Sequence, residues 1–127
     1  MNQQDISQEY LQTQLETVSP GKLILMVYDG TLTFLEEAVE RLRRGDWEGK
    51  GKMILRAQDC ITELMCCLNM EAGEIAQLLY KLYEYLNWRL GQANVQKNLN
   101  GITEVIDLLA TLREGWEGAV RKVEMIR

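Results

Sequence analysis

Apolar residues in this chain recur every three or four positions along four long segments, and Pro20 is the only proline that could interrupt them. This spacing matches the 3.6-residue period of an α-helix, and no alternating strand pattern or strand–helix–strand order accompanies it. The helices are expected at about residues 20–44, 47–68, 74–94 and 99–125. Short connections make consecutive helices antiparallel. The sequence therefore predicts an all-α, up-down-up-down four-helix bundle over residues 19–127.

Residues 1–18 differ from the rest of the chain. They are mostly polar, with isolated apolar residues among them. A helix of this length is too short to be stable alone. We therefore expect a flexible or short-helical N-terminal arm that docks weakly on the bundle.

The predicted second and third helices carry more apolar residues than a bundle of this size can enclose. About eleven of the sixteen residues from Met53 to Leu68 are apolar, whereas a helix packed on one side needs only about 3/7. The stretch from Ile75 to Val95 holds five leucines, three tyrosines and a tryptophan. This excess predicts a further apolar partner, and so a binding protein.

Charge and composition limit the classes of partner. The net charge is −5 and the pI about 4.8, which disfavours nucleic acid, because phosphate binding requires a cationic face. No apolar run approaches the roughly 18 residues of a membrane-spanning helix, and the polar N-terminus is unlike a signal peptide. The sequence predicts a cytoplasmic protein without membrane insertion.

The chain contains no histidine, which removes the commonest general base and the commonest metal ligand. Its three cysteines lie on one helical segment without the spacing of a zinc or redox site. We therefore expect no catalytic residues, no metal site and no cofactor. An enzyme with an all-carboxylate metal site is kept as a remote alternative.

Several short motifs share an order and spacing with a known family. They are Tyr10, Ser19-Pro20-Gly21-Lys22-Leu23, Leu25-Met26-x-Tyr28-Asp29-Gly30, Leu79-Tyr80-x-Leu82-Tyr83-x-Tyr85-Leu86-x-x-Arg89-Leu90-x-x-Ala93-Asn94, and Leu112-Arg113-x-x-Trp116. Together with the intervening residues, from about 10 to 118, they resemble the flagellar secretion chaperone FliS family.

The resemblance implies a non-enzymatic helical bundle that binds the disordered C-terminal segment of newly made flagellin in the cytoplasm. Such a chaperone prevents premature polymerisation and delivers its client to the export gate of the flagellar type III secretion apparatus. The resemblance also implies that the client displaces the N-terminal arm, and some family members bind the flagellar anti-sigma factor.

The helical period predicts core stripes on the second, third and fourth helices, respectively Ile54, Ala57, Ile61, Leu64 and Leu68; Ile75, Leu79, Leu82, Leu86, Leu90 and Ala93; and Ile102, Val105, Ile106, Leu109, Leu112, Trp116, Val120 and Val123. A client-binding groove is expected on apolar residues at the sides of these stripes. The candidates are Met53, Cys60, Met65, Leu68, Leu78, Tyr83, Leu86 and Leu90. Core packing is the alternative for Leu68, Tyr83, Leu86 and Leu90. Tyr10, Leu15 and Val18 are expected to be the arm residues that compete for this groove.

Two other functions use the same apolar excess. A regulatory adaptor would bind the anti-sigma factor or another flagellar protein as its main client. A structural homodimer would cover the excess with a second copy of the chain when no client is present.

Overall fold

The computed structural model describes residues 19–126, with side chains to residue 122. Its elements are helices α2 (Pro20–Arg43), α3 (Trp47–Cys66), α4 (Glu74–Gln96) and α5 (Leu99–Ile126), with the short 3-10 helix η1 (Met70–Ala72) between α3 and α4. Each helix begins and ends within two residues of its predicted bounds. The arm, with Tyr10, Leu15 and Val18, lies outside the described residues. A flexible or short-helical arm that docks weakly on the bundle therefore stays a prediction.

Polar caps set the first two helix starts. The Ser19 hydroxyl accepts a hydrogen bond from the Lys22 amide at 3.3 Å, and Pro20 suits the first helical position because its missing N–H would be unpaired there anyway. Gly45 follows α2 with a φ of 78°, a left-handed conformation that glycine adopts without strain. Asp46 then accepts a hydrogen bond from the Gly49 amide at 2.9 Å and begins α3.

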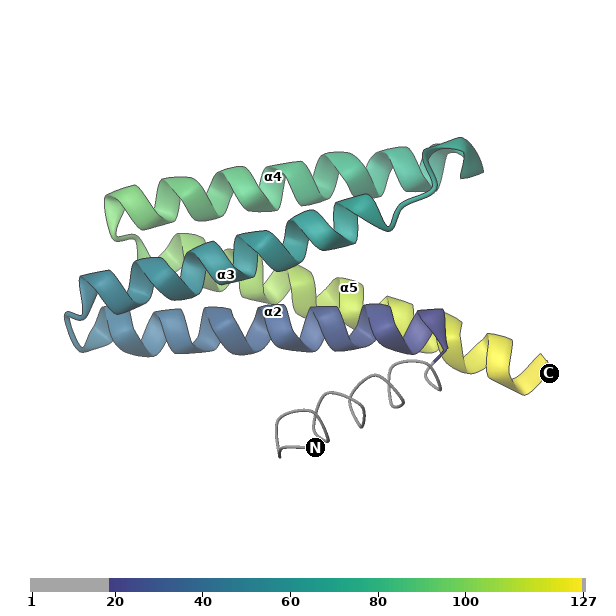
Figure 1. The fold of residues 1–127 in the computed structure, drawn as a ribbon, viewed down its shortest axis with the longest axis horizontal. Helices are drawn as coiled ribbons and strands as arrows, with labels where there is room; N and C mark the ends of the chain where they lie inside the picture. Colours follow the sequence, from purple (N-terminus) through teal and green to yellow (C-terminus); the bar gives the residue numbers. More distant parts are fainter. Residues whose placement is uncertain (1–18, 127) are drawn as a thin grey trace, which may run out of the picture.

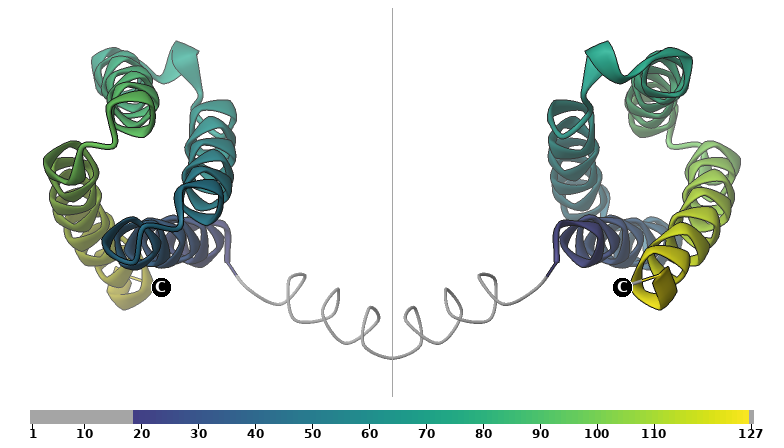
Figure 2. Two further views of the ribbon diagram at one scale, coloured as in Figure 1. Left: turned by 90° about the vertical axis from the view of Figure 1, so that its left-hand side faces the viewer. Right: turned by 90° about the vertical axis from the view of Figure 1, so that its right-hand side faces the viewer.

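The four helices run alternately in opposite directions and form an antiparallel bundle, as Figure 1 shows. Viewed end-on in Figure 2, they stand at the corners of a square. The adjacent pairs in contact are α2 with α3, α3 with α4, α4 with α5, and α5 with α2. The all-α, up-down-up-down prediction is confirmed.

One apolar core runs through the centre of this square. Its completely buried members come from all four helices: Leu35, Ala38, Ile54, Ala57, Ile61, Leu86, Leu90, Ala93, Ile102, Val105 and Leu109. The expected core stripes of the second and fourth helices therefore largely lie inside the bundle. On α4, however, the first expected core residue, Ile75, is 76% exposed. It stands one residue after the start of the helix, where no neighbouring helix covers it.

The two ends of the bundle are joined differently. At one end the buried Lys50 ammonium donates to the carbonyl and the side-chain oxygen of Asn94, at 2.9 and 2.6 Å, and ties α3 to α4. There α5 also passes close to α4, since a Cβ on Gly101 would lie 2.8 Å from the Ala93 Cβ. At the other end, η1 and its flanking residues make a longer connection between α3 and α4.

The difference between core and surface leucines predicts the effect of truncation. Leu86→Ala should lower the free energy of unfolding by about 2–5 kcal/mol, because it removes a fully enclosed side chain and leaves a cavity. Leu55→Ala, on α3, is the matched control, since Leu55 is 58% exposed, and should change stability by less than about 0.5 kcal/mol. Urea denaturation measures both. Equal losses in the two variants would contradict this assignment of the core.

Candidate functional site

Three of the predicted groove residues do not lie on the surface. Leu86 and Leu90 are 0% exposed and Tyr83 is 3% exposed. None of the three is open to solvent in this structure, so their contact with a client stays a prediction. All three point from α4 into the shared core, where α2, α3 and α5 supply the apolar cover that the sequence assigned to a client.

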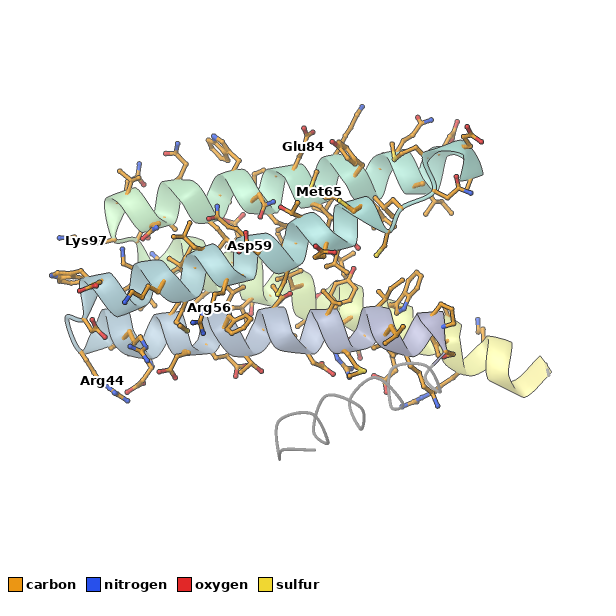
Figure 3. All side chains as sticks on the ribbon, viewed as in Figure 1. Arg44, Arg56, Asp59, Met65, Glu84 and Lys97 are labelled. Carbon is orange, nitrogen blue, oxygen red and sulfur yellow. The ribbon has the colours of Figure 1, made fainter. Side chains whose placement is uncertain are left out.

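The remaining predicted groove residues lie on different sides of the bundle. Met53 and Cys60 share a face with Arg56, at spacings of three and four residues, and the Arg56 guanidinium lies 5.9 Å from the centre of the Phe34 ring on α2. Their face of α3 is therefore turned toward α2, as the labelled Arg56 in Figure 3 illustrates. Leu78 lies on the side of α4 that faces α5. The predicted residues therefore do not form one continuous groove.

An apolar cavity lies near the end of the bundle where α3 connects to α4. Its volume is about 160 Å³, and all four helices contribute to its wall: Ile24, Leu64, Cys67, Leu68, Asn69, Leu79, Tyr83 and Trp116. We call it the end cavity. Two predicted groove residues, Leu68 and Tyr83, line it, and Met65 lies one turn before Leu68. A cavity of this size and lining suits an inserted apolar side chain.

A pair of tyrosines stands beside the end cavity. The hydroxyls of Tyr28 on α2 and Tyr83 on α4 are in hydrogen-bonding contact within the protein interior. Burial raises the pKa of both groups, and the contact with Tyr83 raises that of Tyr28 further. Both hydroxyls therefore stay protonated, and one of them donates a hydrogen bond to the other. The sequence did not reveal this pair, because Tyr28 and Tyr83 are 55 residues apart.

A second apolar surface lies where α4 and α5 are neighbours. Spacings of three and four residues place its α4 members on one face, and the same rule groups its α5 members. They are Ile75, Leu78, Leu82 and Tyr85 on α4, with Leu108 and Leu112 on α5. We call this surface the α4–α5 flank. Leu78 is its most exposed leucine, at 66%, and Leu108 and Leu112 are half-buried against the core.

Polar contacts bridge α4 and α5 at one end of this flank. The Glu104 carboxylate on α5 accepts hydrogen bonds from the Tyr85 hydroxyl at 2.8 Å and from the Arg89 guanidinium at 2.7 Å. The bond from Arg89, with that from Tyr85, holds the pKa of Glu104 below its usual range. The carboxylate is therefore ionised at neutral pH. These contacts show that the Tyr85 face of α4 is turned toward α5.

An exposed aromatic residue lies next to these contacts. The Trp88 ring stands 6.0 Å from the Tyr85 ring, measured between centroids, and is tilted by 35°. Trp88 is exposed in the middle of α4.

The described residues offer surfaces for binding. Within residues 19–122, no three or more cysteine, aspartate or glutamate side chains gather where they could hold a metal ion. No helix within the described residues is long and apolar enough to cross a membrane.

The four-helix bundle, with its apolar end cavity and apolar flank, places this protein in the class of helical binding proteins. Residues 2–123 of the chain match the family model described as "Flagellar protein FliS". The chain therefore belongs to the FliS family. Its role is that of a flagellar export chaperone, and membership of a chaperone family implies binding rather than catalysis.

Known relatives support this assignment over most of the chain. The flagellar secretion chaperone FliS of Bacillus subtilis is 32% identical over 112 residues, which cover 88% of this chain and 84% of the relative. The FliS of Campylobacter jejuni is 36% identical over 108 residues, which cover 84% of each. A crystal structure of a bacterial flagellar chaperone shares the fold, with a TM-score of 0.76 at 19% identity over 95% of this chain and 99% of that one.

The tyrosine pair predicts non-additive mutational effects. Tyr28→Phe or Tyr83→Phe alone should lower the free energy of unfolding by about 1–3 kcal/mol, because each leaves a buried hydroxyl without a partner. The double variant should lose less than the sum of the two single losses, since no unpaired hydroxyl remains. Denaturant unfolding of the four proteins measures this. Strictly additive losses would contradict the pairing.

Proposed function

We propose that this chain binds the C-terminal segment of flagellin in the end cavity and along the α4–α5 flank. It thereby keeps the client from polymerising and delivers it, in the cytoplasm, to the flagellar export gate. The observation that carries the proposal is the exposure of Leu78 within an apolar strip that runs beside the cavity. A monomeric protein gains nothing from such a strip in water, whereas a partner would cover it.

The two surfaces suit one mode of recognition. An amphipathic helix can lay its apolar face along a groove between two helices, with anchors at intervals of three and four residues. The α4–α5 flank presents apolar residues at matching intervals. The end cavity accepts one side chain beyond the strip. Together they favour a client that is helical when bound and disordered when free.

A chaperone must also release its client. Ordering a disordered segment costs about 2–5 kcal/mol or more of the gross interaction energy, which moderates the affinity. The apolar surface of this chain is short and is bounded by the polar contacts around Glu104. This arrangement favours binding that is strong enough for transport and weak enough for transfer at the export gate.

Substitution of the exposed leucine tests the site. Leu78→Gln should weaken binding of a flagellin C-terminal peptide by at least about tenfold, or about 1.4 kcal/mol, because it removes apolar contact without disturbing the core. Leu55→Gln changes a similarly exposed leucine on α3 and should leave affinity unchanged. Calorimetric titration measures affinity, and circular dichroism checks that helicity is kept. Equal affinities for wild type and Leu78→Gln would reject this placement of the client.

The N-terminal arm is expected to compete with the client through Tyr10, Leu15 and Val18. Deletion of residues 1–16 should then preserve or raise the affinity for the flagellin peptide, because a competitor has been removed. The same titration measures this effect. A large loss of affinity would mean that the arm forms part of the binding site.

A further inference from the structure

The charges along the two edges of the α4–α5 flank are unequal. On the α5 edge, Asp107 and Glu114 are exposed and have no ionic partner among the described residues. On the α4 edge, the exposed Lys81 lies seven residues after the exposed Glu74 and so shares a face with it, and their opposite charges cancel. Glu84 points away from the bundle in Figure 3 and does not border the strip. The α5 edge therefore presents negative charge that nothing in this part of the protein neutralises.

The two acids stand at the border of the apolar strip. Asp107, Thr111 and Glu114 are spaced by four and three residues and so share one face of α5. Thr111 is also three residues from Leu108, which places this face directly beside the strip. Seven residues of helix separate the two carboxylates along the axis by about 10.5 Å, or two turns.

The neighbouring basic residues of α5 do not neutralise this edge. Arg113 is bound to Asp29 and Glu117, and Arg121 is bound to Glu117. Lys122 follows two turns after Glu114, in the stretch of α5 that runs past the start of α4 (Figure 1). The acids at 107 and 114 are thus available to a partner.

We propose that the α4–α5 flank selects an amphipathic helix whose apolar stripe is bordered on one side by lysine or arginine residues two turns apart. The apolar stripe covers Leu78, Leu82 and Leu112, and the basic residues lie over Asp107 and Glu114. This inference rests on the proposed function, because it states the chemistry of the client segment at that surface. The charged edge fixes which side of the bound helix faces α5.

Two other occupants are disfavoured by the same charges. A second copy of the chain, docked through this flank about a two-fold axis, would bring like surfaces together and so place unpaired acids near one another. The chain's own residues 1–18 contain Asp5, Glu9 and Glu16 and no lysine or arginine. They offer no basic border for the α5 edge.

Two designed peptides test the proposal on the full-length protein. Each is about 18 residues long, or about five helical turns, with the same leucine stripe, and carries either two lysines or two glutamates seven residues apart at its border. Wild-type protein should bind the lysine-bordered peptide about tenfold more tightly, the combined effect of two exposed attractions gained and two repulsions avoided. Raising the salt concentration should reduce this difference, because exposed charges are screened.

Two double variants that remove the same charge from different places test whether Asp107 and Glu114 cause the preference for the lysine-bordered peptide. Asp107→Asn/Glu114→Gln should reduce the preference to about threefold or less. Glu36→Gln/Asp59→Asn removes the same charge from exposed acids of α2 and α3 and should keep the tenfold preference. Equal affinity of wild type for both peptides, or equal losses in the two double variants, would overturn the proposal.

Further outcomes assign the flank to another occupant. Tighter binding of a peptide of residues 1–18 than of the lysine-bordered peptide would overturn the proposal in favour of the arm. A dimer in sedimentation that Asp107→Asn/Glu114→Gln strengthens and Leu78→Gln abolishes would overturn it in favour of a second copy.

Binding of the flagellin peptide with no effect of the Asp107 and Glu114 substitutions would reject the charge selection alone. A lysine-bordered peptide that binds while the flagellin peptide does not would reject the proposed client alone.

Discussion

The close approach of α4 and α5 at Gly101 is the constraint on which the binding surfaces depend. A side chain at this position would collide with Ala93 and crowd Arg89, so glycine lets the two helices meet at the start of α5. The nearby ion pair between Arg89 and Glu104, at 2.7 Å, then holds their relative rotation. With that rotation set, Leu78 and Leu82 lie on the side of α4 that is turned toward α5. The apolar flank is thus a product of polar and steric contacts that lie further along the same two helices.

Much of the fold could be predicted from the sequence, because helix periods and end signals are local. Ser19, Gly45 and Asp46 act on their immediate neighbours, and the stripes containing Ile54, Ile61 and Ile102 identify buried faces without knowledge of the partner helix. Ile75 was wrongly placed in the core, since its burial depends on how far the neighbouring helices extend past it. That information is not local to α4.

The candidate site was less predictable for a related reason. A helical sequence gives the angle between two side chains on the same helix, but not which neighbour each side will meet. The sequence therefore predicts that Met53 and Leu78 share a groove, although Met53 lies on the side of α3 toward α2 and Leu78 on the side of α4 toward α5. The burial of Tyr83 could not be predicted, because it depends on the Tyr28 hydroxyl as a partner, a contact between residues far apart in the chain. The general expectation of uncovered apolar surface holds, at Leu78 and along the flank.

One contact links the end cavity to the beginning of the bundle. The Trp116 indole lines the cavity, and its N–H donates a hydrogen bond to the Gly21 carbonyl at 3.0 Å in the first turn of α2. The Trp116 ring therefore lines the cavity that would receive a side chain, and it also holds the first turn of α2 in place. A side chain that enters the end cavity would contact a ring that is hydrogen-bonded to the first turn of α2, and the emission of this indole, one of three in the chain, offers an optical signal of that contact.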